Sequence, residues 1–133
     1  KSGVQAPNDA MHGSKSTSEK QDISIQKEEG VKSINYLYDN KEDLNSQKVI
    51  VKGVVTKYNP NIMNKNWVHI QDGTGDENSF DLTITTKDEV KVGAIVKFEG
   101  TVVINQDFGH GYEYDLLLQD AVQLDKPEEI KMN

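Results

Sequence analysis

Two residue types are entirely missing from this 133-residue chain, namely cysteine and arginine. The absence of cysteine excludes disulfides, thiolate metal ligands and a cysteine nucleophile. The absence of arginine removes the side chain that binds phosphate through two parallel hydrogen bonds. Long hydrophobic runs are missing too, since no apolar stretch approaches the roughly 20 residues that span a bilayer. The chain therefore lacks a disulfide scaffold and the best phosphate donor.

The charge balance is acidic, with a formal net charge of -7 at pH 7. Proteins that bind nucleic acid strongly and without specificity need a basic surface, so this balance argues against such binding while leaving a local basic groove open. Catalytic motifs are absent as well: no serine lies in a nucleophile elbow, no phosphate loop is present and no histidine has an acidic partner at motif spacing. We expect a non-enzymatic domain with no cofactor.

The apolar residues divide the chain into one domain and two extensions. Residues 1–30 contain few large apolar residues, and positions 13–20 show no periodicity, so this part cannot bury enough surface to offset the entropy of ordering. We predict a flexible tail or spacer at 1–30, a domain at 31–125 and a C-terminal tail at 126–133. The N-terminal tail is either a tether or a plain disordered terminus.

A short helical segment is predicted at residues 33–44. Ser33 suits an N-cap, and Ile34, Leu37 and Tyr38 follow at spacings that form one helical face. We expect one or two helical turns that close an end of a barrel.

From residue 48 onward the pattern is that of strands. Five are expected, starting at residue 48 and then at 67–71, 80–85, 94–104 and 112–124, with loops at 59–66 and 105–111. Gly53 and Gly100 lie inside the two long strands, where glycine marks a bulge or a sharp bend. A first strand that bends to serve both halves of a small closed sheet favours an all-β, five-stranded Greek-key OB-fold barrel. An SH3-like barrel is the alternative.

Three sequence stretches resemble a family of bacterial OB-fold proteins described as nucleic-acid-binding, many of them secreted or lipid-anchored. The stretches are residues 51–63, residues 66–75 and residues 107–112, which include Asn66-Trp67-Val68-His69 and Phe108-Gly109-His110-Gly111-Tyr112. The resemblance implies a cell-envelope or periplasmic protein whose acylated cysteine was lost with a leader, so that the tail is a spacer to the membrane. It implies a ligand only by analogy of fold, which does not fix function.

The surface that OB folds generally use for oligomeric ligands is the outer side of the second and third strands. Alternation directs Val68 and Ile70 inward, and so directs Trp67, His69 and Gln71 outward. On the third strand Asp81, Thr83 and Thr85 point outward. Trp67 could stack a base or sugar there for roughly 1–3 kcal/mol, but we favour its packing under the Asn-rich loop, covered by Ile62 or Met63.

A second aromatic group surrounds the loop between the fourth and fifth strands. Phe108, Tyr112 and Tyr114 could close over a ligand, although we favour Tyr112 and Tyr114 as core or half-core residues that share a face with Leu116 and Leu118. A soft-metal site of His69, His110 and Met63 is a remote alternative. The candidate ligand-binding residues are Lys57, Lys65, Trp67, His69, Gln71, Thr83, Phe108, His110 and Tyr112.

Two partner classes follow from these residues. The first is single-stranded nucleic acid or another oligomer, bound weakly at the outer face. The second is another protein of the bacterial envelope, which the acidic balance and the missing arginine favour. Salt dependence separates the two classes, because phosphate binding weakens steeply with salt.

Overall fold

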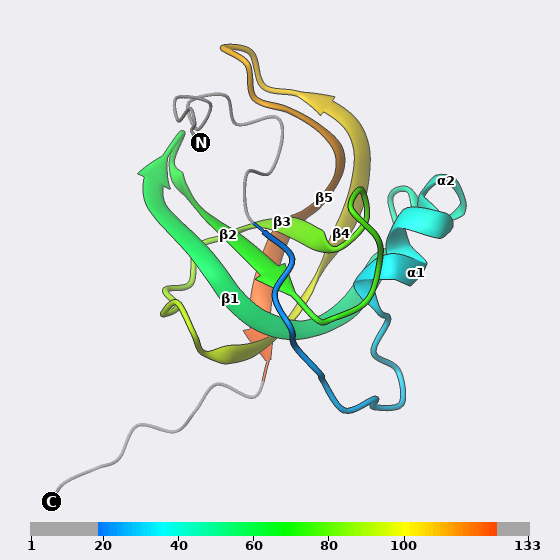
Figure 1. Ribbon diagram of the computed structural model, residues 1–133. Helices are drawn as coiled ribbons and strands as arrows, with labels where there is room; N and C mark the ends of the chain where they lie inside the picture. Colours follow the sequence, from blue (N-terminus) through cyan, green and yellow to red (C-terminus); the bar gives the residue numbers. More distant parts are fainter. Residues whose placement is uncertain (1–18, 125–133) are drawn as a thin grey trace, which may run out of the picture.

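The computed structural model of this chain describes residues 19–124. Residues 1–18 of the predicted tail and the predicted C-terminal tail lie outside the described residues. The described part is mostly β, with two short helices (Figure 1). The predicted all-β class is therefore confirmed.

Five strands form one closed sheet. They are β1 (Lys48–Ile62), β2 (Lys65–Gln71), β3 (Asp81–Thr86), β4 (Ile95–Asp107) and β5 (Glu113–Leu124). Their order around the sheet is β1-β2-β3-β5-β4, and β4 pairs with β1 to close it. All neighbours are antiparallel except β3 and β5, which are parallel. The number of strands agrees with the sequence prediction.

Strand β1 belongs to both halves of the sheet, as predicted. Its first half pairs with β4 up to Val54, and its second half pairs with β2 from Val54 onward. Gly53 lies at this exchange of partners, where a Cβ would stand 2.6 Å from the backbone oxygen of Gln71. The glycine is needed because two strands approach closely, a stronger constraint than the bend that the sequence suggested.

The loop predicted at residues 59–66 is wrong in its extent. Strands β1 and β2 continue through most of it and pair as far as Ile62 and Lys65, leaving a two-residue turn at Met63 and Asn64. Both turn residues have positive φ, 54° and 65°, as a type I′ hairpin turn requires. The asparagines that indicated a loop serve instead as residues that tolerate this turn conformation.

The predicted helical segment is present as α1 (Ile34–Asp39) and α2 (Lys41–Leu44). The Ser33 hydroxyl caps α1 by accepting a hydrogen bond from the Tyr36 backbone N–H. Ile34 and Leu37 are fully buried in the core that fills the closed sheet. Within residues 19–124, no helix combines the length and apolar character that crossing a membrane would take.

Residues 19–30, which the sequence placed in the flexible tail, lie against the closed sheet. This segment, called the N-terminal strap from here on, crosses in front of β1 before the chain turns toward α1 (Figure 1). Glu28 bridges the ammonium groups of Lys52 and Lys97, each at 2.7 Å, and Val31 then forms a β-bridge with Ile50. Polar and backbone contacts hold the strap, so a search for large apolar residues misses it.

The Glu28 ion pairs predict acid sensitivity of the strap. Hydrogen bonds from Lys52 and Lys97 lower the pKa of Glu28 from 4.5 to about 2. Because the pKa is lower in the folded state, the stabilising contribution is complete above about pH 4.5 and is lost as the pH falls toward 2. We expect the NMR signals of residues 20–30 to move toward random-coil positions over this range, and Glu28→Gln to cause the same change at neutral pH.

The matched control for that change is Glu29→Gln, which removes the same charge from the exposed neighbouring residue. It should leave the strap signals in place. Equal effects of the two substitutions would show that net charge, and not the Glu28 ion pairs, anchors the strap.

Candidate functional site

The outer side of strands β2 and β3 carries the side chains that the sequence assigned to it. Val68, Ile70, Leu82 and Ile84 fill the interior, so the alternate residues face outward. This outer surface, called the β2–β3 face, consists of Trp67, His69, Gln71, Asp81, Thr83 and Thr85. All six are buried, with at most 9% exposure. The predicted orientation is correct, but the face is covered where the sequence implied an open surface.

Aromatic side chains cover one end of the face. Trp67 is 3% exposed and forms a second buried cluster with Tyr114 and Leu117. Its ring stacks on Tyr114 at 5.6 Å and meets Phe108 edge-on at 5.3 Å, and its indole N–H donates to the Ile62 backbone oxygen at 2.9 Å. The favoured interpretation of Trp67 as a packed residue holds, and Ile62 does contribute to its cover.

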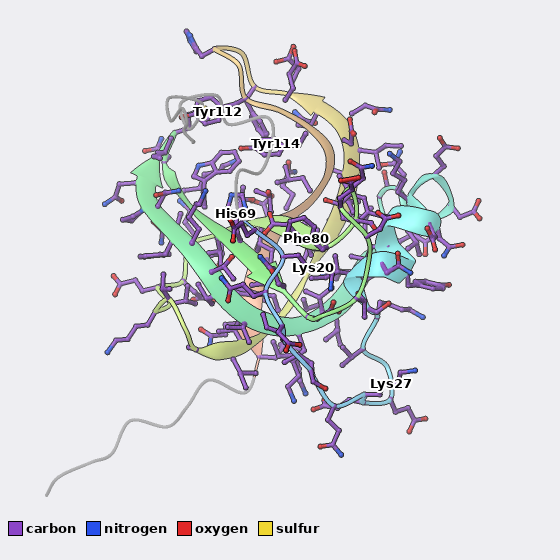
Figure 2. The ribbon with its side chains drawn as sticks, in the orientation of Figure 1. Lys20, Lys27, His69, Phe80, Tyr112 and Tyr114 are labelled. Atoms are coloured by element: carbon purple, nitrogen blue, oxygen red, sulfur yellow. The ribbon has the colours of Figure 1, made fainter. Side chains whose placement is uncertain are left out.

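The β4–β5 hairpin supplies most of that cover. The end of this hairpin lies at the top of Figure 1. Figure 2 shows Tyr112 and Tyr114 near that end, above His69 on β2. Tyr114 is buried, and this burial together with nearby Tyr112 raises the pKa of Tyr114 to about 12. Tyr114 is a core residue and Tyr112 is half-buried, as expected, but both pack with Trp67 and Leu117 and not with Leu116 and Leu118, which fill the interior of the sheet. Phe108 is half-buried against the same cluster, and His110 is exposed in the connecting turn.

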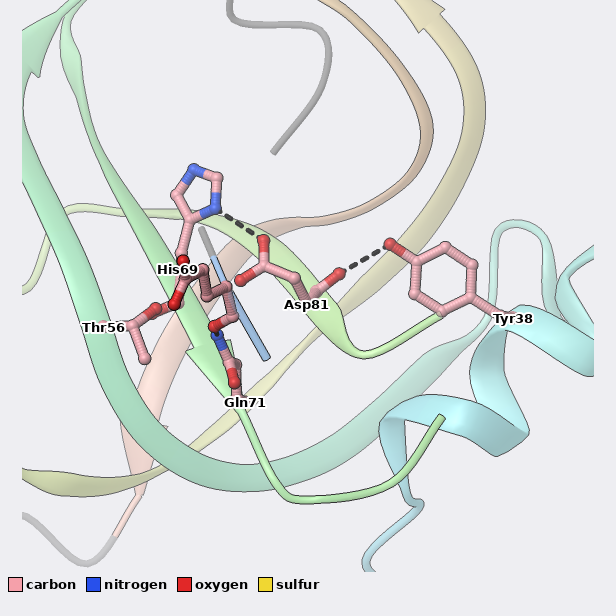
Figure 3. Close-up of polar contacts among 6 residues, drawn as sticks. Tyr38, Thr56, His69, Gln71 and Asp81 are labelled. Carbon is pink, nitrogen blue, oxygen red and sulfur yellow. Dashed lines mark hydrogen bonds and ion pairs between the residues drawn. The ribbon is translucent and has the colours of Figure 1, made fainter. Parts of the chain in front are cut away.

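The centre of the face is a histidine–carboxylate pair. His69 Nδ1 and Asp81 Oδ2 are 2.7 Å apart, and both side chains are nearly excluded from solvent. The two residues are diagonal neighbours, because His69 is paired with Thr83 and Asp81 with Gln71. Tyr38 of α1 donates its hydroxyl to the Asp81 backbone oxygen at 2.6 Å (Figure 3). The pair is thus fixed from both the sheet and the helix.

One atom of this pair has no partner among residues 19–124. Asp81 Oδ1 is buried and accepts no hydrogen bond from any of them. An unsatisfied buried polar atom costs about 1–3 kcal/mol, and more when it carries charge, so native structures rarely retain one without a reason. Burial of Tyr38, whose hydroxyl donates to the Asp81 backbone oxygen, raises the pKa of that hydroxyl.

The other end of the face holds the N-terminal strap. The Gln71 side chain, 1% exposed, donates from its amide to the Glu19 backbone oxygen at 3.0 Å and accepts from the Gln21 backbone N–H at 2.8 Å. The Lys20 ammonium donates to the Gly73 backbone oxygen at 3.1 Å. The Gln71 amide therefore pairs with an extended chain in the way a neighbouring β-strand would.

The two candidate lysines lie at different edges of this arrangement. Lys57 is half-buried on β1 and is the register partner of His69. Lys65 begins β2, with its ammonium 5.5 Å from the centre of the Phe108 ring. Thr83 is buried beside His69. The structure thus brings most candidate residues to one face, but it does not leave Trp67 free to stack on a ligand.

The alternative soft-metal site is not assembled. Met63 lies at the hairpin tip and His69 six residues further along an extended strand, which separates them by about 20 Å at the usual rise of a β-strand. His69 Nδ1 already faces Asp81. Among residues 19–124, no group of three or more histidine, aspartate or glutamate side chains is arranged to hold a metal ion.

The turn after β2 has a structural role. The Asp72 carboxylate accepts hydrogen bonds from the backbone N–H groups of Ile34 and Thr74, and the Thr74 hydroxyl accepts one from Asn35. These bonds satisfy free donors at the start of α1.

Asp81, Tyr38 and the strap residues were not among the predicted site residues. Comparison with protein-family models and with curated proteins finds no match for this chain.

Proposed function

We propose that this chain is a non-enzymatic binding module with an OB fold, and that its β2–β3 face binds an extended polypeptide. The closed order β1-β2-β3-β5-β4 supports the OB assignment, because OB folds are five-stranded Greek-key barrels whose second and third strands carry the ligand surface. The β1–β2 and β4–β5 hairpins flank this face, as the ligand-binding loops of such barrels do.

The observation that carries the proposal is the pair of hydrogen bonds between the Gln71 side chain and the backbone of the strap. The Gln71 amide contacts the strap at two backbone atoms, the Glu19 oxygen and the Gln21 nitrogen. Backbone pairing of this kind recognises an extended chain with little regard to its side chains, which is the principle of recognition by strand addition. The strap is thus an intramolecular occupant of a surface suited to a polypeptide.

Nucleic acid is the weaker ligand for this face. Asp81 lies at its centre, the chain has net charge -7 and no arginine, and the indole of Trp67 is already stacked on Tyr114. A single-strand site combines a basic groove with exposed aromatic platforms. With the resemblance described above, the proposal extends to a protein partner in the bacterial cell envelope.

The test adds a fluorescently labelled peptide of residues 19–26 to the full chain and follows polarisation. The tethered strap competes at high effective concentration, so binding should be weak to the native chain and tighter to Glu28→Gln, whose strap has lost its ion pairs. Gln71→Met in the Glu28→Gln background should abolish binding, since it removes the amide but keeps the side-chain volume. Gln119→Met on β5 is the matched control and should bind normally.

A single-stranded oligonucleotide provides the competing arm of the test. We expect affinity no better than the non-specific range of about 10⁻⁴–10⁻⁶ M at physiological salt. Peptide binding that is indifferent to Gln71→Met would contradict the proposed face. Sub-micromolar oligonucleotide binding at moderate salt, together with no peptide binding, would replace the proposal with a nucleic-acid function.

A further inference from the structure

The buried carboxylate of Asp81 has one oxygen that lacks a hydrogen-bond donor or a cation among the described residues. Asp81 is 6% exposed, its Oδ2 lies 2.7 Å from His69 Nδ1, and no residue in the described part of the chain donates to Oδ1. A carboxylate oxygen in this position can be satisfied only by a hydrogen-bond donor or a cation. The contact of Oδ2 with His69 Nδ1 orients the carboxylate, and Asp81 is the register partner of Gln71, which binds the strap.

The surroundings favour a positively charged donor. Asp81 is itself a carboxylate, and among residues 19–124 no group donates to its second oxygen. A metal ion would need further ligands, and the described residues assemble no set of three that could hold one. An ammonium or guanidinium group needs only the one free oxygen, and it forms the strongest kind of hydrogen bond with a carboxylate.

The strap leaves this requirement unmet. Its only lysine near the face is Lys20, whose ammonium donates to the Gly73 oxygen. Gln71, which holds the strap, is the direct register partner of Asp81, so their Cβ atoms are expected to be about 4.5–5.5 Å apart. A chain that paired with Gln71 would therefore pass within side-chain reach of Asp81 Oδ1.

We propose that Asp81 is a specificity-determining residue, and that the β2–β3 face selects an extended polypeptide with a lysine or arginine side chain that donates to Asp81 Oδ1. This inference rests on the proposed polypeptide function and names the ligand's chemistry. The strap is a weaker occupant because it fills the Gln71 position but leaves Oδ1 unpaired. A ligand that satisfies both residues displaces it.

The experiment is a substitution scan of the 19–26 peptide, read by polarisation against the full chain carrying Glu28→Gln. Lysine, norleucine or glutamate is placed at each peptide position in turn. We expect one position at which lysine binds about tenfold more tightly than norleucine, the effect of one hydrogen bond to a charged group. Adding Asp81→Leu should reduce that preference to less than about twofold, because it removes both the charge and the acceptor oxygen.

Two controls separate this site from general attraction to an acidic protein. Asp43→Asn removes an equal charge from an exposed position on α2 and should keep the lysine preference. The ¹³C shift of the Asp81 carboxylate should change with the lysine peptide and not with its norleucine counterpart, a readout that needs no Asp81 variant. Lysine and norleucine peptides that bind equally at every position would overturn the inference alone, whereas failure of every peptide to bind would overturn the proposed function.

Discussion

Replacement of Trp67 by alanine should destabilise the whole domain by about 3–5 kcal/mol, the usual cost of removing a buried large aromatic side chain. The indole is 3% exposed and contacts three aromatic rings, those of Phe108, Tyr112 and Tyr114. These contacts join the β4–β5 hairpin to β2. Their loss leaves a cavity that half-buried side chains at a hairpin end cannot fill without exposing apolar surface.

Urea unfolding followed by circular dichroism measures this effect, since the substitution removes the only tryptophan. Trp67→Phe is the matched variant, because it keeps an aromatic ring and loses the N–H bond to Ile62. We expect it to cost less than the alanine change. A loss below about 1 kcal/mol for Trp67→Ala, within the range of surface substitutions, would mean that the cluster opens in solution and that Trp67 is free to stack on a ligand.

Strands β2 and β3 were predictable because their interior apolar residues recur at every second position. Val68 and Ile70 were directed inward correctly, and Asp81, Thr83 and Thr85 were directed outward correctly. The hairpin between β1 and β2 was shortened in the prediction because asparagine is typical of loops. Its φ values show that Asn61 and Asn64 are accommodated within a regular hairpin. Composition could not distinguish a long loop from a tight hairpin turn, because asparagine tolerates the positive φ that both require.

The strap was missed for a different reason. Its anchors are Glu28 with two lysines and the Gln71 amide on its backbone, and neither type of contact leaves an apolar pattern in the sequence. The alternation of half-buried Ile23 and Ile25 with exposed Ser24 was the one available signal, and it is too short to predict a strand. Sequence periodicity reports burial of apolar faces, so polar attachment escapes it.

The candidate site shows the same limit. Alternation correctly placed His69 and Gln71 outward, and Asp81 with them, but it says nothing about register. The approach of His69 to Asp81 depends on the pairing of Gln71 with Asp81, because a shift of one residue would put Asp81 on the opposite face. Long-range register and the path of the strap therefore determine the site, and both depend on tertiary structure.

Gly100→Val should lower the free energy of unfolding by about 1–3 kcal/mol or more, the range for overpacking a core. A Cβ at position 100 would stand 2.8 Å from the Ala121 Cβ and 2.9 Å from Leu118 Cγ. Both neighbours belong to the buried core. The sequence suggested a backbone bend as the reason for this glycine, but the φ of Gly100 is not in the left-handed region. The reason is instead a steric clash with side chains of β5, opposite a shift in strand register.

A double-mutant cycle tests that reason directly. Gly100→Ala should already destabilise the domain, because the first added carbon makes the clash. Combining it with Ala121→Gly removes the Cβ that it meets, so the two changes together should cost less than the sum of their separate effects. Gly93→Ala measures the cost of backbone strain without crowding. A Cβ at position 93 meets nothing within 4 Å, but the φ of +94° is unfavourable for alanine. Strict additivity at positions 100 and 121 would show that backbone conformation, and not crowding against β5, requires the glycine.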